Sequence, residues 1–421
     1  MITQQIIAIL IFALVMIAII SEKINRCVAA LGGGLLMVLF NILPAEVGLS
    51  HVDFNTIGVL IGMMLFVAVV KNSGLFEYIA ILTAKKANGD PWKIMISFVI
   101  ITALLSAILD NVTTVLLIGP MTIVITHILG LNPVPFLMSQ IISSNVGGTA
   151  TLIGDPPNIM IGSAANLSFT DFVVNLGPIV IVLLFIIILC FKFIFSKQII
   201  VNESHKQDIL NLDENKAIKD KTLLIKSIVV MIFILLGFTL HSIIHIESSI
   251  IALTGATVIL LIGKQDIDEI LASIEWSTIV FFIGLFIIVG GLQEVGIINN
   301  LATALITATE GHLVLTMLII LWLSAIVSSF LDNIPFVATI IPIILTMESQ
   351  GIDVMPLWWA TSLGACLGGN GTLIGASANI VLANVGQKHG HPITFKDYFK
   401  VGFPIMILTI IISTVYLIIK F

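Results

Sequence analysis

The chain has 421 residues, of which 58% are hydrophobic and 10% are charged, and its formal net charge at pH 7 is −6. Soluble proteins carry about 25% charged residues, and a soluble domain cannot hide this much apolar surface from water. Because no long polar or basic tract is present, a disordered chain, a coiled coil and a nucleic-acid-binding protein are also excluded. The composition therefore predicts an all-α membrane protein that crosses the bilayer many times.

Apolar runs of about 17 to 22 residues, bounded by charges or prolines, predict membrane-spanning helices. The first set of runs covers residues 4–20, 26–43, 54–72, 93–128, 135–165 and 173–195. The segment that follows, 196–222, is rich in Lys, Asp, Glu and Asn and is the one predicted soluble linker. The second set covers residues 223–240, 247–263, 276–293, 313–347, 356–385 and 399–420. The first run has no basic start and no small-residue cleavage site, so we expect it to be a retained span.

The two sets of runs are copies of each other. The matched pairs are 53–80 with 275–302 and Asp110-Asn111 with Asp332-Asn333 at an offset of 222, and Thr151-Leu152-Ile153-Gly154 with Thr372-Leu373-Ile374-Gly375 at an offset of 221. Chance similarity between apolar helices would exchange Leu for Ile and would not keep Asp-Asn pairs in register. We therefore divide the chain into a first repeat (1–195), the linker (196–222) and a second repeat (223–421).

The placement of Lys and Arg predicts the orientation of the chain in the membrane. If the N-terminus is outside and each half crosses an odd number of times, all 18 basic residues except Lys420 are cytoplasmic, Lys23 and Arg26 included. This distribution satisfies the positive-inside rule. We expect an inner-membrane or plasma-membrane protein with both termini outside and the linker in the cytoplasm. An odd number of crossings inverts one half relative to the other, as in secondary transporters.

The runs 93–128 and 313–347 each consist of two arms that meet at an Asp-Asn pair. An arm of about 17 residues could be a full span or half of a re-entrant hairpin. We favour hairpins, because a loop at the membrane surface should be longer and more polar than two residues. The fold is then expected to have about ten transmembrane helices and two hairpins.

Asp110 and Asp332, at the two hairpin tips, are the strongest candidates for the functional site. Burial of a carboxylate in a bilayer costs roughly 2.5 to 3.5 kcal/mol, and such residues usually lie on an ion or proton path. The alternative is that each aspartate caps the second arm of its hairpin, although a serine would do so without a charge. We predict that both bind a proton or Na⁺.

The runs 135–165 and 356–385 are each interrupted by glycines, and the first also by Pro156-Pro157. A break in mid-membrane frees backbone groups that can form a cage for an ion or small polar solute. Alternatively, the glycines serve close packing of a kinked helix. The predicted binding residues are Asp110, Asn111, Asn145, Thr149, Thr151, Asp155, Asn158, Asp332, Asn333, Asn370, Thr372 and Asn379. The residue matched to Asp155 in the second repeat is Ala376, which has no carboxylate. Asp155 is therefore either a third coupling carboxylate or a helix N-cap.

The sequence predicts no catalytic residue, no cofactor beyond Na⁺ or H⁺ as coupling ion, and no metal beyond Na⁺ at these same residues. His241 and His245 lack the glutamate of a zinc-protease motif, and the three cysteines lie far apart. An intramembrane aspartyl protease would need a glycine two residues before Gly154-Asp155, where Leu152 stands. We therefore expect a protein that is not an enzyme.

The segments 109–117 and 145–158 resemble the ion transporter superfamily, above all its ArsB/NhaD branch of arsenite-efflux permeases, NhaD-type sodium–proton antiporters and the P protein. The resemblance implies a scaffold of outer helices that usually forms a homodimer, and a transport domain of hairpins and broken helices that moves like an elevator. An arsenite-type member would also have a cytoplasmic ATPase as partner.

The related dicarboxylate carriers have Ser-Asn-Thr at the hairpin tips, where this chain has Asp110-Asn111-Val112 and Asp332-Asn333-Ile334. Two carboxylates repel an anionic substrate unless protons or cations bind first, and no Lys, Arg or His lies in the predicted core. We therefore expect a secondary active transporter that moves a small inorganic solute, arsenite or antimonite or Na⁺, coupled to protons. A Na⁺-coupled carrier of carboxylates such as citrate is the alternative, and an ion channel ranks third.

Overall fold

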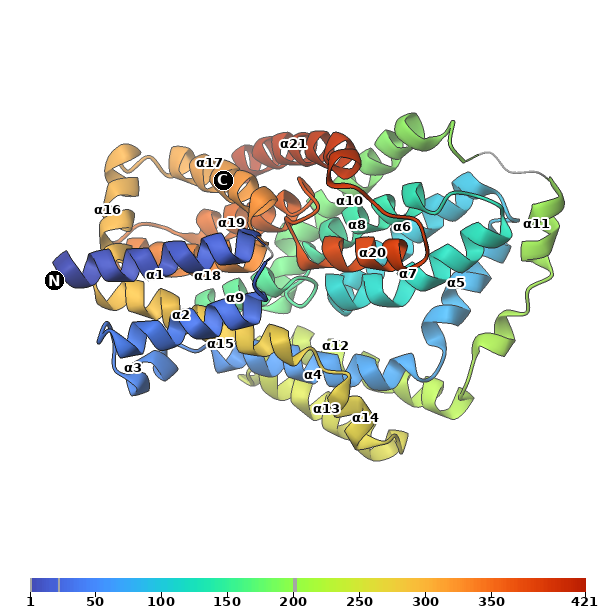
Figure 1. Ribbon diagram of the computed structural model, residues 1–421, viewed down its shortest axis with the longest axis horizontal. Coiled ribbons are helices and arrows are strands. Elements are labelled where there is room, and N and C mark those ends of the chain that lie inside the picture. The colour runs from blue at the N-terminus through green and yellow to red at the C-terminus, as the bar shows by residue number, and fades with distance from the viewer. Residues whose placement is uncertain (1, 22, 200–202) are drawn as a thin grey trace.

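The computed structural model describes residues 2–21, 23–199 and 203–421. Within these residues the chain forms 21 α-helices, one 3-10 helix and no β-strand (Figure 1). Nine of the described helices are long and apolar enough to cross a membrane, and α2, α13, α16 and α18 are shorter apolar helices. The prediction of an all-α polytopic membrane protein is confirmed.

The helices of the first half are α1 (Ile2–Ser21), α2 (Arg26–Leu39), α3 (Ala45–Ser50), α4 (Phe54–Lys71), α5 (Leu75–Lys86), α6 (Pro91–Ile108), α7 (Asn111–Ile128), α8 (Val134–Gly148), α9 (Pro156–Ala165) and α10 (Phe169–Phe195). The linker contains α11 (Glu203–Leu210) and η1 (Glu214–Ala217). The helices of the second half are α12 (Lys221–Ile244), α13 (Ser248–Gly263), α14 (Ile267–Ala272), α15 (Trp276–Glu294), α16 (Ile297–Ala308), α17 (Leu313–Phe330), α18 (Asn333–Ser349), α19 (Met355–Gly368), α20 (Ser377–Lys388) and α21 (Phe395–Lys420).

The starting residues of the helices repeat at a constant spacing. The helices α2 to α7 begin 222 residues before α13 to α18, as residues 26 and 248 illustrate, and α8 and α9 begin 221 residues before α19 and α20, as 134 and 355 illustrate. The short helices α3, α5, α14 and α16 obey the same spacing, although the sequence analysis did not predict them. Their 6 or 12 residues are too few for the apolar run of a membrane span.

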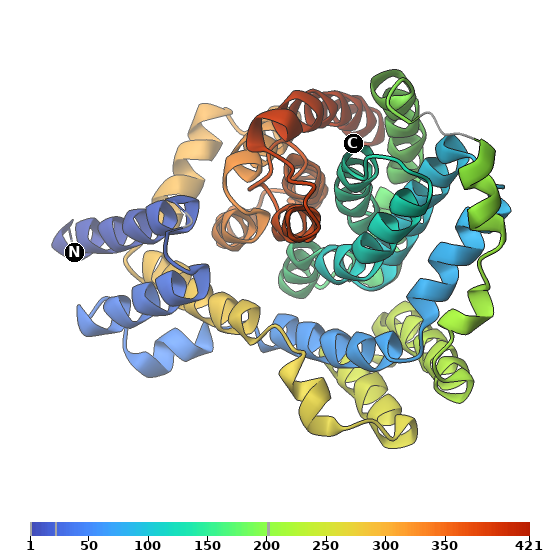
Figure 2. The same cartoon turned by 45° about the vertical axis from the view of Figure 1, so that its right-hand side comes forward.

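The helices form an outer and an inner group (Figure 2). The inner group consists of α6–α10 and α17–α21, whose two halves interlock where α7 packs on α20 and α9 packs on α18. The outer group consists of α1–α4 and α12–α15, in which α2 packs on α15 and α4 packs on α13. The helices α5 and α16 connect the outer group to the inner group in each half, and we call them the arm helices.

The hairpin tips lie inside the inner group. The helices α6 and α7 meet at Asp110, which is 9% exposed, and α17 and α18 meet at Asp332, which is 8% exposed. A loop between two full spans would instead reach the membrane surface and be exposed to water, so this burial agrees with the hairpin interpretation. The runs predicted to be interrupted are broken as expected, α8 from α9 at 149–155 and α19 from α20 at 369–376.

Glycines bring each hairpin and its broken helix into backbone contact. A Cβ atom added to Gly147 of α8 would lie 2.2 Å from the carbonyl oxygen of Ala103 on α6. A Cβ atom at the matched Gly368 of α19 would lie 2.6 Å from the carbonyl oxygen of Ala325 on α17. Both interpretations of the glycine-rich runs therefore hold, because the helices are broken and the glycines that precede the breaks serve close packing.

The linker packs on the arm helix α5. The Lys85 ammonium donates to Glu214 at 2.5 Å and to the carbonyl of Leu212 at 2.8 Å, and Lys219 donates its backbone N–H to Ser73 at 3.0 Å. The hydrogen bond from Lys85 holds the pKa of Glu214 below its usual range, so this ion pair is charged at neutral pH. The linker is thus fastened to one arm helix in addition to being solvated.

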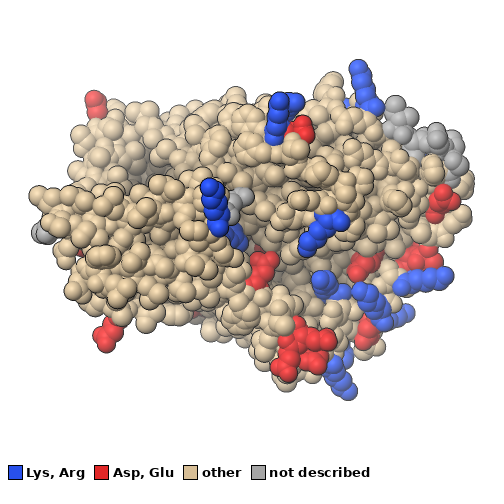
Figure 3. All heavy atoms as spheres, viewed as in Figure 1, with Lys and Arg blue, Asp and Glu red and all other residues tan. Residues whose placement is uncertain are grey.

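Basic side chains are unevenly distributed over the surface. On the face shown in Figure 3, the described Lys and Arg side chains lie over the middle and the right-hand part of the molecule. None of them lies over the left-hand end, which carries α16 and the start of α1. The predicted orientation, with the linker side in the cytoplasm, stays a prediction.

Candidate functional site

Matched hydrogen bonds hold each hairpin against the broken helix of its own half. Ser106 donates to the carbonyl of Ser144 at 2.6 Å, and Ser328 donates to the carbonyl of Ala365 at 2.7 Å. The two serines come from α6 and α17, and the two carbonyls from α8 and α19. Each tip is therefore positioned beside a helix break.

The threonines and asparagines of the two breaks bind backbone groups rather than an open space. Thr151 donates to the carbonyl of Ala107 at 2.5 Å, and Thr372 donates to that of Ser329. The Asn158 amide donates to the carbonyl of Thr151 at 2.9 Å, and the Asn379 amide donates to that of Thr372 at 2.9 Å. The two asparagines thus satisfy carbonyls that each break frees, and the two threonines satisfy carbonyls at the ends of α6 and α17, next to the hairpin tips.

Asn145 of α8 links the two halves at the centre of the inner group. Its amide nitrogen donates to Asn370 at 3.0 Å and to Asn379 at 2.9 Å, and its oxygen accepts from Asn111 at 3.3 Å. All four side chains are at most 2% exposed. Another predicted residue, Thr149, is fully buried and donates to the Asn145 carbonyl at 2.8 Å.

Replacing Asn145 by alanine is expected to lower the free energy of unfolding by about 2 kcal/mol, since three buried hydrogen bonds are lost together. Thermal unfolding in detergent micelles measures the effect. The control is Asn300→Ala on the exposed surface of α16, for which we expect a change within about 0.5 kcal/mol. Equal stability of the two variants would contradict a linking role for Asn145.

Three carboxylates converge on this region from both halves. Asp155 is 1% exposed, and both its oxygens accept from the Asn333 amide at 3.2 Å. Because Asn333 follows Asp332 in the chain, this contact places Asp155 beside the second hairpin tip. Although Asp155 occupies the N-cap position of α9, its side chain makes no capping hydrogen bond. The structure therefore favours the interpretation of Asp155 as a third carboxylate of the site over that of a helix cap.

Asp110 and Asp332 also cap their helices, as the alternative interpretation proposed. Asp110 accepts from the backbone of Thr113 at 2.8 Å, and Asp332 accepts from that of Ile334 at 3.2 Å. Their surroundings otherwise differ. Asp332 accepts from Ser377 of α20 at 2.6 Å and pairs with Arg26 at 2.9 Å.

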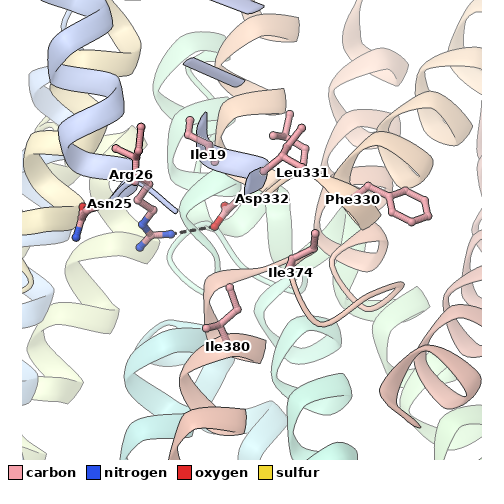
Figure 4. Close-up of a pocket in the computed structure, with 10 residues that line it drawn as sticks. Ile19, Asn25, Arg26, Phe330, Leu331, Asp332, Ile374 and Ile380 are labelled. Atoms are coloured by element: carbon pink, nitrogen blue, oxygen red, sulfur yellow. Dashed lines mark hydrogen bonds and ion pairs between the residues drawn. The ribbon is translucent and has the colours of Figure 1, made fainter. Parts of the chain in front are cut away.

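Arg26 corrects the sequence analysis, which placed it at the cytoplasmic surface and predicted no basic side chain in the core. Its side chain is 28% exposed and lines a cavity of about 170 Å³ between the start of α2 and the second hairpin tip (Figure 4). Figure 4 shows the guanidinium pointing from the outer group at Asp332. Arg26 is the only arginine among the 18 basic residues, and arginine is the cation best suited to buried ion pairs. The presence of a single arginine in the sequence could therefore have singled out Arg26 as a candidate for a buried ion pair.

Two buried polar atoms in the site have no hydrogen-bond partner among the described residues. They are Oδ1 of Asn111 and Nδ2 of Asn370, which lie on opposite sides of Asn145. Buried polar atoms usually have partners, so these two are available to a ligand. The oxygen of Asn111 could accept a hydrogen bond or coordinate a cation, and the amide nitrogen of Asn370 could donate a hydrogen bond to a small polar solute. No cluster of three metal-ligating His, Cys, Asp or Glu side chains occurs in the described part of the chain.

Every residue of the predicted site lies in this one region, together with Ser362, Ser377 and Arg26, which were not predicted from the sequence. Ser362 of α19 donates to Oδ1 of Asn158 at 2.6 Å, across the two halves. Cys366, matched to Asn145 in the repeat, lies 3.5 Å from the same oxygen. A serine in a buried apolar helix gave no signal of its own in the sequence, because hydroxyls often satisfy the preceding turn.

Three comparisons place this architecture among known proteins. The profile of the family described as citrate transporter (CitMHS) matches residues 16–364. The chain is 40% identical to a 46 kDa membrane protein of Mycobacterium leprae, over 98% of both chains, and 40% identical to an uncharacterized transporter of Mycobacterium tuberculosis, again over 98% of both. It is 32% identical to the human P protein, over 99% of this chain and 60% of that protein.

A solved structure has the same fold. It is the crystal structure of the Alcanivorax borkumensis YdaH transporter, described as having an unusual topology, which superimposes with a TM-score of 0.54. The superposition covers 91% of this chain and 87% of the other, at 12% sequence identity. An identity this low shows that the fold is shared.

Proposed function

The chain is a membrane transporter that belongs to the citrate transporter family, and we propose that it is a secondary active carrier coupled to protons. In this proposal it moves a small inorganic solute, arsenite or antimonite or Na⁺, by alternating access. The inner group, with its hairpins and broken helices, is the moving transport domain, and the outer group is the scaffold.

The observation that carries the proposal is the charge in the site. Asp110, Asp155 and Asp332 are each at most 9% exposed, and Arg26 is the one cation that contacts any of them through a described ion pair. Two carboxylates are thus left to be neutralised, and a proton or metal cation does this at the least cost in desolvation. A site of this kind favours a cation or a neutral solute over a polyanion.

Arg26 supports a second candidate, a Na⁺-coupled carrier of carboxylates. A guanidinium can bind a carboxylate through two parallel hydrogen bonds, and the matching family is described as citrate transporter. In this alternative, Na⁺ or protons would first bind to the aspartates. The anion would then replace Asp332 as the ion-pair partner of Arg26. We rank it second because Asp332 already pairs with the guanidinium.

The remaining parts of the proposal concern location and partners. We place the protein in the plasma or inner membrane, with both termini outside and the linker in the cytoplasm, because basic side chains gather toward the linker. The proposed partners are the bilayer, a second copy of the chain, and, for arsenite transport alone, a cytoplasmic ATPase. We propose no enzyme activity and no nucleic-acid partner.

A ligand screen separates the two candidates. Purified protein is heated with Na⁺, Li⁺, arsenite, antimonite or citrate at several pH values, because a ligand that binds the folded state raises the unfolding temperature. We expect stabilisation by one of the inorganic solutes and none by citrate alone. Stabilisation by citrate that depends on Na⁺ would establish the second candidate, and a rate of uncoupled ion flux above about 10⁵ per second would point to a channel.

A further inference from the structure

Arg26 lies between the two groups of helices and contacts both. On the outer side its guanidinium donates to Thr278 of α15 at 3.3 Å and lies 5.3 Å from the ring centre of Phe281. On the inner side it donates to Asp332 at 2.9 Å and to Ser377 of α20. One side chain thus joins the proposed scaffold to the second hairpin tip and to the second broken helix.

Among the described residues, the first hairpin tip has no such link, although the positions are matched in the repeat. The residue 222 positions after Arg26 is Ser248, which carries no charge. The aspartate matched to Asp332 is Asp110, whose backbone φ of +148° lies in a region that favours glycine and costs a larger residue about 1 to 3 kcal/mol. One tip is therefore held by an ion pair across the groups, and the other tip is strained.

We infer that Arg26 is a latch that holds the transport domain in the observed position and is released when a cation binds Asp332. This inference rests on the proposed function, in which the inner group moves against the outer group. Arg26 is always charged, so the strength of the ion pair depends on Asp332. A cation such as Na⁺ on Asp332 weakens the attraction, and the transport domain is then free to move.

The other charged groups around the tip make this competition effective. Asp155 approaches from α9 through Asn333, Asp110 is the first hairpin tip, and Glu275 precedes α15 and accepts from Thr278 at 3.1 Å. All three are acidic. They attract a cation into the region, and Arg26 and the incoming cation compete for the same Asp332 oxygens.

The distance between the two groups tests the latch directly. Spin labels are attached at Leu14 on α1 and Gln387 on α20, which are both exposed. Cys27 and Cys190 are replaced by serine, and the buried Cys366 is kept. Distance distributions are recorded in lipid nanodiscs at pH 8 without Na⁺ and at pH 8 with Na⁺, with choline chloride to keep the ionic strength constant.

We expect one main distance at pH 8 without Na⁺. Arg26→Ala and Asp332→Asn should each raise the proportion of a second distance about tenfold. In the protein with Arg26, Na⁺ should produce the same second distance. Arg26→Lys keeps the charge and should remain nearer to the original distribution, whereas Lys23→Ala, which removes an exposed cation from the same loop, should leave it unchanged.

An Arg26→Ala distribution equal to that of the parent protein would overturn the latch, and so would an equal effect of Lys23→Ala. The readout requires no transport. A distance change without any coupled flux would therefore refute the proposed function and keep the latch, while coupled flux with unchanged distances would do the reverse.

Discussion

Asp110→Asn and Asp332→Asn are each expected to reduce proton-coupled transport to the rate of liposomes without protein. An asparagine side chain is neutral and cannot be protonated, so each variant loses the carboxylate that would bind the coupling proton or cation. The fold should survive, because asparagine caps a helix as well as aspartate does. Both aspartates have this capping role, through the backbone of Thr113 and of Ile334.

Proteoliposomes with an imposed pH gradient measure the effect, with the solute that the ligand screen identifies. The matched control is Asp353→Asn, since Asp353 is exposed and also accepts from a backbone N–H, that of Met355 at 3.1 Å. The control should transport at the parent rate. Full coupled activity in both hairpin variants would show that neither aspartate carries the coupling ion.

Gly147→Ala is expected to lower the free energy of unfolding by about 3 kcal/mol or more, the upper range for an overpacked core. The added methyl group would lie 2.2 Å from the Ala103 carbonyl oxygen and 2.4 Å from its Cα atom. Both are backbone atoms of α6, so no side-chain rotation can relieve the clash. Gly368→Ala should behave alike, since its methyl group would meet the backbone of Ala325 at 2.6 and 2.7 Å.

Unfolding in detergent and the yield of folded protein provide the measurements. The control is Gly32→Ala on α2, where a Cβ atom would meet nothing within 4 Å. Within a helix, alanine is favoured over glycine by about 1 kcal/mol, so this variant should equal or exceed the parent in stability. A Gly147→Ala protein as stable as the Gly32→Ala protein would contradict the close contact of α6 with α8.

The long helices and the breaks were predictable because the bilayer dictates the length of an apolar span and penalises irregular backbone. The arm helices were not, because 12 residues leave no distinct hydropathy signal. For the site, the residues were predictable and their orientations were not. Thr151 and Asn158 were expected to face a solute, yet Thr151 binds a carbonyl at the end of α6 and Asn158 binds a carbonyl of the break.

Arg26 could not be placed by a rule that counts every cation alike. The positive-inside rule reports on the average position of Lys and Arg in loops, and it treats an arginine at the start of α2 as a surface charge. Whether such a side chain turns inward depends on a carboxylate more than 300 positions later, here Asp332. A contact between residues this far apart in the sequence cannot be recognised from a local sequence pattern.

The constant spacing of the helix starts has a thermodynamic consequence. In the proposed alternating-access cycle the two halves exchange conformations, so contacts between identical matched residues have the same free energy in both states and cancel. The balance between the two states then rests on the positions where the halves differ, such as Arg26 and Ser248, Asn145 and Cys366, or Asp155 and Ala376. In the proposed carrier, a few unlike residues in a duplicated chain therefore set the resting state.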